Sequence, residues 1–356
     1  MAAPPPAAKL PTIRPHHSPR LRVGFITSCL VVGGVEHWLL ALAKYSNQEL
    51  DWSVVVTNPT LVDTEMRSAI EQYAEVGIGE SVLPQLVNSV DVIVAWGVDD
   101  LERLVRGFDG PIVQVAHNVG CWTENFLAAN RSVASNSVAV SQAAATAFRH
   151  RDVTVIPNGV DRDRCHALRS REVVRQEWGL APNEVAIGFV GRLSPEKNPL
   201  AISRAVRELG PGFRAVYVGK GYFEDLRPAA RAITPDAIFV PPMHQIGDAL
   251  NALDCLIMAS SCEGFSLALV ECLVAGLPLV TTPVGIVPDL LREHGLSLVT
   301  VPIAPSSRQL AEAVQKAISP AHRPFIEQAR TVAIACYTAE VMAGNWVAYL
   351  QGLRCR

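Results

Sequence analysis

The sequence predicts an α/β protein made of two Rossmann-like domains in tandem, each with a parallel sheet and helices on its faces. The chain has 356 residues, which exceeds the usual size of one hydrophobic core and favours two domains. Short β-branched apolar runs alternate with stretches whose apolar residues recur at helical spacing. This alternation is typical of parallel βαβ units, and it occurs as two successive series.

The first series predicts a domain over residues 21–160. It begins with a strand at residues 21–29 and a helix at residues 37–46. The loop between them contains Gly33 and Gly34, which permit a tight turn and let the backbone approach a ligand without an intervening side chain. Further strands are expected at residues 52–57, 91–97, 111–118, 137–141 and 153–159, with helices between most of them.

The second series predicts a domain over residues 161–330. A charged stretch with one short helix, residues 161–184, forms the junction between the domains. The expected strands are residues 185–191, 214–221, 237–242, 254–260, 277–282 and 296–301, and the helices are residues 200–209, 223–233, 246–253 and 266–276. Residues 331–356 continue in helical rhythm, whereas residues 1–20 contain six prolines and are expected to form a disordered tail.

Composition excludes several classes of protein. The formal net charge is −3 and no run of Lys or Arg forms a stripe, so nucleic acid is not an expected partner. The eight cysteines include no Cys-x-x-Cys pair, which favours neither a disulfide framework nor a zinc site and is consistent with a cytoplasmic location. No integral membrane segment is expected. Residues 21–158 hold 8 Lys and Arg against 15 Asp and Glu, which disfavours binding to anionic lipid, although peripheral membrane association stays open.

The segment EGFSLALVE follows an expected strand and contains two glutamates, Glu263 and Glu271. Ser266 is expected to cap a helix that runs to about Ala275. Gly264 leaves the loop bare, so the amides of Phe265, Ser266 and Leu267 are expected to point outward with the helix dipole behind them, which suits a diphosphate. Glu271 has apolar neighbours, and a partly buried carboxylate there needs hydroxyl partners such as those of ribose. Acidic residues are also common on a solvated first turn, so that alternative stays open.

The segment FVGRLSPEKN also follows a strand and places Arg192 and Lys197 after Gly191, around the rigid turn at Pro195. Because ligands bind beyond the carboxyl ends of parallel strands, we expect both cations to converge on one spot and to stabilise a departing diphosphate. Solvated surface cations are the alternative interpretation.

Together these segments resemble the retaining glycosyltransferases of the group 1 or family 4 type, which include bacterial mannosyltransferases and relatives of sucrose synthase and glycogen synthase. The chain matches four motifs in family order over residues 21–300: GGVE at Gly33–Glu36, IPNGVD at Ile156–Asp161, GRLSPEKN at Gly191–Asn198 and EGFSLALVE at Glu263–Glu271. The resemblance implies the GT-B architecture, in which two Rossmann-like domains flank a cleft, an acceptor-binding first domain, and a last helix that returns towards that domain.

The resemblance also assigns roles to residues. Arg192 and Lys197 would hold the diphosphate of a nucleotide-diphosphate sugar, Glu271 would bind the ribose, and Glu263 would contact the transferred sugar beside the reacting carbon. Gly34 would lie near the donor phosphates, and main chain near Val240–Ile246 would contact the base. His117, at the end of an expected strand, matches the position whose histidine faces the sugar; a packed strand-end histidine is the alternative.

Transfer with retention of configuration and without a metal or other cofactor is therefore expected. The only Asp-x-Asp sequence, Asp161–Asp163, lies in the junction and not at a donor-site strand. Two departures from the family pattern concern donor choice: Ile286 and Asp289 follow Gly285 where the family has a second glycine and a glutamate, and Ser266 stands where glycine is common. Donor base, sugar, acceptor and oligomeric state are not specified by the sequence.

Three alternatives stay open on this scaffold: a nucleotide-sugar epimerase, a phosphorylase with pyridoxal phosphate, and a nucleotide-sugar-binding protein without turnover. A dehydrogenase is disfavoured because LVVGGVE lacks Gly-x-Gly-x-x-Gly and no acidic residue follows the second strand. Trp346 and Tyr349 are expected to be packing residues and not an acceptor platform.

Overall fold

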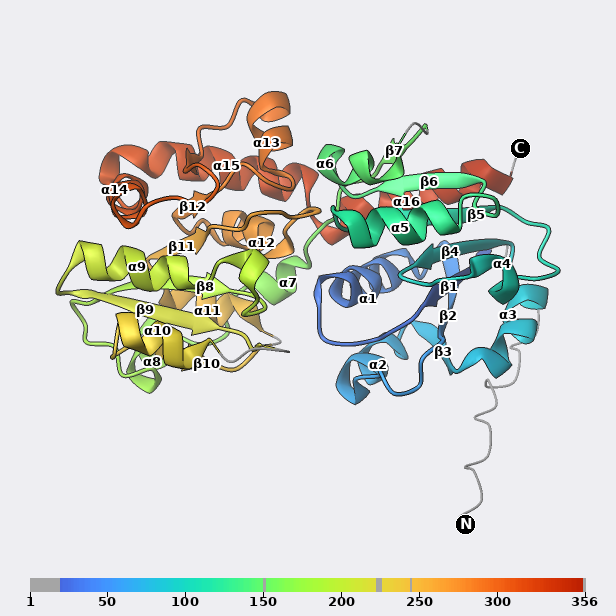
Figure 1. Ribbon diagram of the computed structural model, residues 1–356, viewed down its shortest axis with the longest axis horizontal. Coiled ribbons are helices and arrows are strands. Elements are labelled where there is room, and N and C mark those ends of the chain that lie inside the picture. Colours follow the sequence, from blue (N-terminus) through green and yellow to red (C-terminus); the bar gives the residue numbers. More distant parts are fainter. Residues whose placement is uncertain (1–19, 150–151, 222–225, 244, 355–356) are drawn as a thin grey trace, which may run out of the picture. The chain divides into compact units, whose positions relative to one another are not determined.

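The computed structural model describes residues 20–149, 152–221, 226–243 and 245–354, and these fall into two compact units. The first unit contains the described residues up to Gly159 and those from Ala339 onward, and the second is Val160–Thr338. The tail predicted for residues 1–19, part of the helix predicted for residues 223–233, and His244 lie outside the described residues. Figure 1 shows the elements of each unit.

The first unit is a parallel sheet with helices on both faces, as predicted. Its strands, in the order β3-β2-β1-β4-β5-β6-β7, are β1 (Leu21–Thr27), β2 (Leu50–Val56), β3 (Ala74–Ile78), β4 (Val92–Trp96), β5 (Ile112–Ala116), β6 (Asn136–Ala139) and β7 (Thr154–Val155). Its helices are α1 (Gly34–Ser46), α2 (Thr64–Ile70), α3 (Leu83–Ser89), α4 (Leu101–Leu104), α5 (Cys121–Ala129), α6 (Gln142–Ala145) and α16 (Ala339–Arg354).

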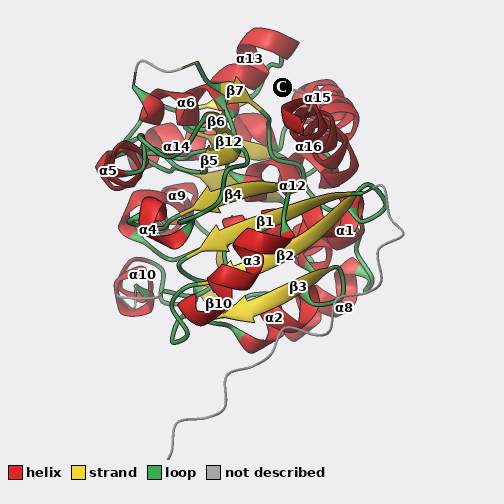
Figure 2. Cartoon of the chain, turned by 90° about the vertical axis from the view of Figure 1, so that its right-hand side faces the viewer, coloured by secondary structure: helices red, strands yellow, loops and turns green. Residues whose placement is uncertain are grey.

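Apolar side chains on the two faces of this sheet explain how its helices pack. Ile26, Ile93 and Ala95 face α3 and α4 and form one core cluster with Leu86 and Leu101. Figure 2 shows α1 and α16 on the opposite side of the same sheet from α4. The sequence analysis did not predict β3, because the run AEVGI is short and contains a glutamate.

The second unit repeats the arrangement with a parallel sheet in the order β10-β9-β8-β11-β12-β13. Its strands are β8 (Val185–Val190), β9 (Phe213–Val218), β10 (Ile238–Val240), β11 (Cys255–Met258), β12 (Leu279–Thr281) and β13 (Val299–Thr300). Its helices are α7 (Arg162–Cys165), α8 (Arg171–Glu177), α9 (Leu200–Leu209), α10 (Arg227–Ile233), α11 (Ile246–Ala252), α12 (Leu267–Ala275), α13 (Val287–His294), α14 (Ser307–Ala317) and α15 (Arg323–Cys336).

The core of the second unit lies between the sheet and the helices α9, α10 and α14. Ile202 and Val206 of α9 and Leu310 and Val314 of α14 pack against Ile257 of β11. The junction at residues 161–184, for which one helix was predicted, contains two, α7 and α8. Ser170 caps α8 by accepting a hydrogen bond from the Val173 N–H, and this cap separates the two helices.

The end of the chain contains two helices, and only the second belongs to the first unit. The backbone passes between the units at Gly159/Val160 and again at Thr338/Ala339. Within the first unit, Trp346 of α16 makes an edge contact with Trp38 of α1 at a ring-centroid distance of 5.5 Å. Both indoles are fully buried. Trp346 is therefore a packing residue.

We expect Trp346→Ala to lower the free energy of unfolding by about 3–5 kcal/mol, because it removes a fully buried indole and leaves a cavity beside α1. Urea denaturation followed by tryptophan fluorescence and circular dichroism measures this loss. The neighbouring exposed residue supplies the control, since Asn345→Ala should change stability by less than about 0.5 kcal/mol. A loss below about 1 kcal/mol for Trp346→Ala would contradict the packing role.

Candidate functional site

The loops that follow β8 and β9 lie side by side at the carboxyl edge of the second sheet. The Gly191 N–H donates to the Val218 carbonyl at 3.0 Å, and the Leu193 N–H donates to the Lys220 carbonyl at 3.0 Å. Gly219 has φ +144°, and a Cβ there would lie 1.9 Å from the Gly191 carbonyl oxygen. Only glycine permits this approach, so the loop that carries Arg192 and Lys197 has a fixed position at the edge where parallel sheets bind ligands.

Lys197 and Glu263 form the centre of this edge. Both belong to loops after strands, yet they are far apart in the sequence. The Lys197 ammonium donates to both carboxylate oxygens of Glu263 at 2.6 Å, and the Ser260 hydroxyl donates to Glu263 Oε1 at 2.7 Å. Glu263 is buried at 7% exposure. The structure therefore brings together a cation and a carboxylate that the sequence analysis assigned to one site.

Arg192 has a different partner. Its guanidinium is about half exposed and donates to Glu196 Oε1 at 3.0 Å, within its own loop. The same loop is tied to the glutamate loop because the Ser261 N–H donates to the Glu196 carbonyl at 2.8 Å. Arg192 and Lys197 thus lie in one fixed loop but are paired with separate carboxylates.

The helix that follows Glu263 begins at Leu267 and ends at Ala275, as predicted, but Ser266 does not cap it with its hydroxyl. Ser266 has φ +86° and ψ +84°, and its Oγ faces Met258 Sδ at 3.8 Å. That prediction was wrong because a left-handed backbone points the side chain away from the first-turn amides. The first-turn N–H groups of α12 still project from its N-terminal end, beside Gly264 and Phe265.

Gly285 packs closely against the loop that contains Glu263 and Phe265. Its φ is +61°, and a Cβ there would lie 2.6 Å from the Phe265 carbonyl oxygen and 2.9 Å from Glu263 Cβ. The Ile286 N–H donates to the same Phe265 carbonyl at 3.1 Å. Ile286 and Asp289, the residues that depart from the family pattern, are both buried under this loop.

Glu271, on the second turn of α12, is 6% exposed, and its partner is the guanidinium of Arg164 on α7. The sequence predicts hydroxyl partners for this carboxylate and does not point to Arg164. A pair separated by more than a hundred residues gives no periodic signal, and the neighbours Asp161 and Asp163 draw attention only as a candidate metal motif. In the structure Asp161 accepts from the Asp163 N–H at 3.0 Å and caps α7.

In the first unit, His117 follows β5 and lies within an aromatic cluster. Its ring makes edge contacts with Trp38 at 4.4 Å and Trp96 at 5.0 Å between centroids. His117 is 8% exposed, and its Nε2 has no hydrogen-bond partner within the described part of the chain. Burial lowers the pKa of His117 to about 3, so the imidazole is neutral at pH 7.

Trp122 forms the exposed end of the same cluster, and the sequence analysis did not single it out. Its ring is 5.7 Å from that of Trp96, and the residue is 60% exposed at the start of α5. Gly97 lies beside it, and a Cβ there would be at ordinary contact distance, 3.8 Å, from the Trp122 ring. An exposed aromatic ring at a strand-end loop is a surface on which a sugar ring can pack.

The glycines after β1 occupy the start of α1. Gly33 is extended, with φ −158°, and a Cβ there would lie 2.7 Å from the Glu36 carboxylate. Gly34 is the first residue of the helix and is exposed. Their role beside the donor phosphates stays a prediction.

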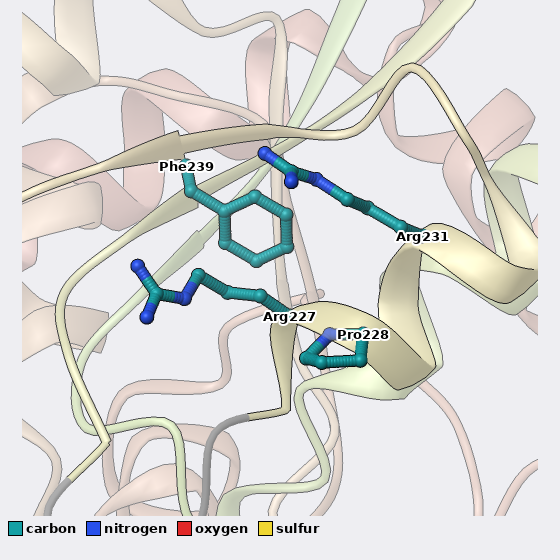
Figure 3. Close-up of a pocket in the computed structure, with 4 residues that line it drawn as sticks. All are labelled: Arg227, Pro228, Arg231 and Phe239. Carbon is teal, nitrogen blue, oxygen red and sulfur yellow. The ribbon is translucent and has the colours of Figure 1, made fainter.

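A separate surface pocket in the second unit is lined by Arg227, Pro228 and Arg231 of α10 and Phe239 of β10, as Figure 3 shows. The Arg231 guanidinium lies 5.3 Å from the centre of the Phe239 ring, and that ring stacks on Tyr217 at 4.8 Å. The pocket contains none of the residues predicted for the site.

Among the described residues, no group of three or more His, Cys, Asp or Glu side chains is arranged to hold a metal ion. No helix in that part of the chain has both the length and the apolar character to span a membrane.

Comparison with known proteins identifies the class to which this fold and site correspond. Residues 184–319 match the family model described as Glycosyl transferases group 1, and this range contains Arg192, Lys197, Glu263 and Glu271. The chain is 32% identical over 201 residues to TuaC of Bacillus subtilis, named as a teichuronic acid biosynthesis glycosyltransferase, covering 54% of this chain and 49% of the relative. It is 29% identical to a GDP-mannose-dependent alpha-mannosyltransferase of Mycobacterium tuberculosis, covering 49% of this chain and 45% of the relative.

The chain thus resembles the group 1 glycosyltransferases, and the match to the family model lies within its second unit. The aligned regions span about half the length of these two curated relatives. Solved structures extend the likeness in fold to most of the chain. HepE of Anabaena, solved with UDP-glucose, has a TM-score of 0.78 at 22% identity and covers 94% of this chain and 100% of its own. WaaG, a lipopolysaccharide glycosyltransferase, has a TM-score of 0.70 at 17% identity, covering 93% and 100%. The predicted fold class, two Rossmann-like domains of the GT-B type, is confirmed.

Ser266 stands in a backbone conformation that favours glycine. We therefore expect Ser266→Gly to raise the free energy of unfolding by about 1 kcal/mol, because a residue with a Cβ is strained at φ +86°. Ser266→Ala is the matched control, since it removes the hydroxyl but keeps the Cβ and should give no gain. Thermal and urea unfolding of the three proteins measures the difference, and equal stability of the glycine and alanine variants would contradict the strain.

His117 should make the protein acid-sensitive. Its folded-state pKa of about 3 lies below the ordinary value of 6.5, so only the unfolded state binds the proton between these values. The stabilisation is complete above pH 6.5 and is lost as pH falls towards 3. From pH 7 to pH 5 we expect wild type to lose about 2 kcal/mol more than His117→Gln in urea denaturation.

The exposed histidine His166 supplies the control for this measurement. His166→Gln should keep the pH dependence of the wild type. If His117→Gln kept it as well, the neutral buried imidazole would be excluded as its source.

Proposed function

We propose that this protein transfers a sugar from a nucleotide-diphosphate sugar to an acceptor, with retention of anomeric configuration and without a metal ion or other cofactor. The observation that carries the proposal is the contact between Lys197 and Glu263 at the carboxyl edge of the second sheet. This contact lies inside the range that matches the group 1 family model. Both curated relatives described above are named as glycosyltransferases, which supports the same class of reaction.

Lys197 is suited to stabilise a departing diphosphate. An ammonium group has three N–H donors, and the contacts with Glu263 within the described chain use two of them. The third can meet a phosphate oxygen while Glu263 stays bound. Arg192 in the same loop and the first-turn N–H groups of α12 add positive potential, so charge that develops on the leaving oxygen meets donors already in place.

Glu263 is suited to act beside the reacting carbon. The ion pair with Lys197 and the hydrogen bond from Ser260 fix the direction of its carboxylate, which is needed for contact with a sugar hydroxyl or with positive charge on the anomeric carbon. In the reaction, the bond between this carbon and the diphosphate oxygen breaks, and a bond to an acceptor oxygen forms on the same face. The acceptor proton leaves with the diphosphate or with solvent.

The resemblance assigns His117 to the donor sugar, and in that role it would act as a neutral hydrogen-bonding group. Because burial keeps its imidazole uncharged at pH 7, it is not a proton donor of matched pKa. The exposed ring of Trp122, in the same cluster, is the proposed packing surface for the acceptor. A cytoplasmic location is proposed from the free cysteines of the described residues, among which Cys165, Cys255 and Cys272 are buried.

The donor is identified by a thermal-shift panel of UDP-, GDP- and ADP-sugars, because a specific ligand raises the melting temperature of the state that binds it. HepE was solved with UDP-glucose and another relative is named as GDP-mannose-dependent, so both bases belong in the panel. NMR of the product gives the anomeric configuration, and EDTA tests the need for a metal. Binding without product from a broad acceptor panel would favour a protein without turnover, and conversion of the donor alone would favour an epimerase.

We expect Lys197→Ala and Glu263→Ala each to lower kcat about 10²–10³-fold with the best donor, because each removes a group that acts on charge in the transition state. The exposed pair Lys316→Ala and Glu312→Ala on α14 is the matched control and should leave kcat unchanged. Initial rates of nucleoside diphosphate release measure the effect. Folded Lys197→Ala and Glu263→Ala proteins with wild-type kcat would show that the site is assigned wrongly.

A further inference from the structure

The ion pair between Arg164 and Glu271 is the feature of the second unit that the reaction described above does not explain. Glu271 lies on α12 with a side chain 8% exposed, and Arg164 lies on α7 with a side chain 20% exposed. A buried carboxylate without a cation would favour its neutral form. The pair therefore has a direct consequence for Glu271, since it keeps this carboxylate ionised.

The contact with Glu271 is what holds the Arg164 guanidinium in place. Its Nε is buried and has no hydrogen-bond partner within the described residues, so the Nη1 contact with Glu271 anchors the guanidinium. Because Nε is inaccessible, Arg164 presents this nitrogen neither to solvent nor to a ligand. The geometry is that of a support behind Glu271.

The position of α7 is fixed by the segment at the start of α11. Gln245 donates to the Asp163 carbonyl at 2.8 Å, and Asp248 accepts from the Leu168 N–H at 2.7 Å. Gly247 lies against the end of α7 so closely that a Cβ there would be 2.3 Å from the His166 carbonyl oxygen. Gln245 belongs to residues 240–246, the segment predicted to contact the donor base. Helix α7 therefore contacts both Gln245 of the predicted base segment, through the Asp163 carbonyl, and Glu271, through Arg164.

We propose that Arg164 is the positioning residue of the ribose subsite: it fixes one oxygen of Glu271 and leaves the other, ionised oxygen to accept the two ribose hydroxyls. This rests on the proposed function, in which Glu271 binds the ribose of the donor. An ionised carboxylate is an acceptor only and can take both hydroxyl protons, whereas a protonated one uses part of its surface as a donor. Preference for a ribonucleotide over its 2′-deoxy analogue then depends on Arg164, although Arg164 does not touch the ribose.

The test compares the affinity of each variant for a ribonucleoside diphosphate with its affinity for the 2′-deoxy analogue. Isothermal titration uses UDP against 2′-deoxy-UDP, and GDP and ADP against their 2′-deoxy forms, on the full chain. Wild type should prefer the ribo form by at least about tenfold, since a hydroxyl bond to a charged group is lost in the analogue. In Arg164→Met this preference should fall below about threefold, with the affinity for the ribo form lost and that for the deoxy form little changed.

Arg214→Met is the matched control. Arg214 lies in the same unit with a side chain 19% exposed and is paired with Glu184 at 2.9 Å, but it lies at the start of β9, the opposite edge of the sheet. It should keep the wild-type ratio, and Arg164→Lys, which retains a cation, should recover much of it. If Arg164→Met does not fold, judged by circular dichroism, Arg164→Gln is measured in its place.

Each outcome distinguishes the two proposals. Loss of the ribo preference in Arg164→Met and Glu271→Gln, but not in Arg214→Met, supports the positioning role. A wild-type ratio in Arg164→Met, with loss of the ratio in Glu271→Gln, overturns the role of Arg164 and leaves the proposed function standing. Failure of wild type to bind any of the nucleotides overturns both.

Discussion

The contact between Lys197 and Glu263 is the interaction on which the arrangement of the second unit's ligand edge depends. It joins the loop after β8 to the loop after β11, two segments that meet only because their parallel strands are neighbours in the sheet. Glycines at positions 219 and 285 allow the surrounding backbones to approach within distances that a Cβ would prevent. The cation and the carboxylate therefore have one mutual geometry before any ligand arrives, which is what catalysis by electrostatic preorganisation requires.

Buried carboxylates in this unit follow a common rule with different partners. Glu263 is paired with a lysine, Glu271 with an arginine, and Asp248 with Arg169 and backbone N–H groups. Each pairing avoids the large penalty of an isolated buried charge. Lys197 places a compact charge with a donor to spare at the carboxyl edge of the sheet, whereas the planar guanidinium of Arg164 is mostly buried between α7 and α12.

The first unit supplies a different environment, in which aromatic rings surround a neutral histidine. Trp38 and Trp96 exclude water from His117 and hold its pKa far below the ordinary value. The same rings extend to Trp122 at the surface. The first unit therefore contains a buried group that can form hydrogen bonds without carrying charge at pH 7.

The sequence by itself determined the two parallel βα series, the bounds of α9 and α12, and the residues that flank the carboxyl ends of the strands, because hydrophobic periodicity and strand-end position are local properties. It missed β3, whose five residues have little apolar alternation, and it assigned Ser266 a cap that its positive φ prevents. Only the tertiary structure decided which charge meets which: Lys197 with Glu263, Arg192 with Glu196, and Arg164 with Glu271. Which charged side chains form an ion pair depends on the order of the strands in the sheet and on how closely the loop backbones approach each other. The spacing of these residues along the sequence specifies neither the strand order nor the approach.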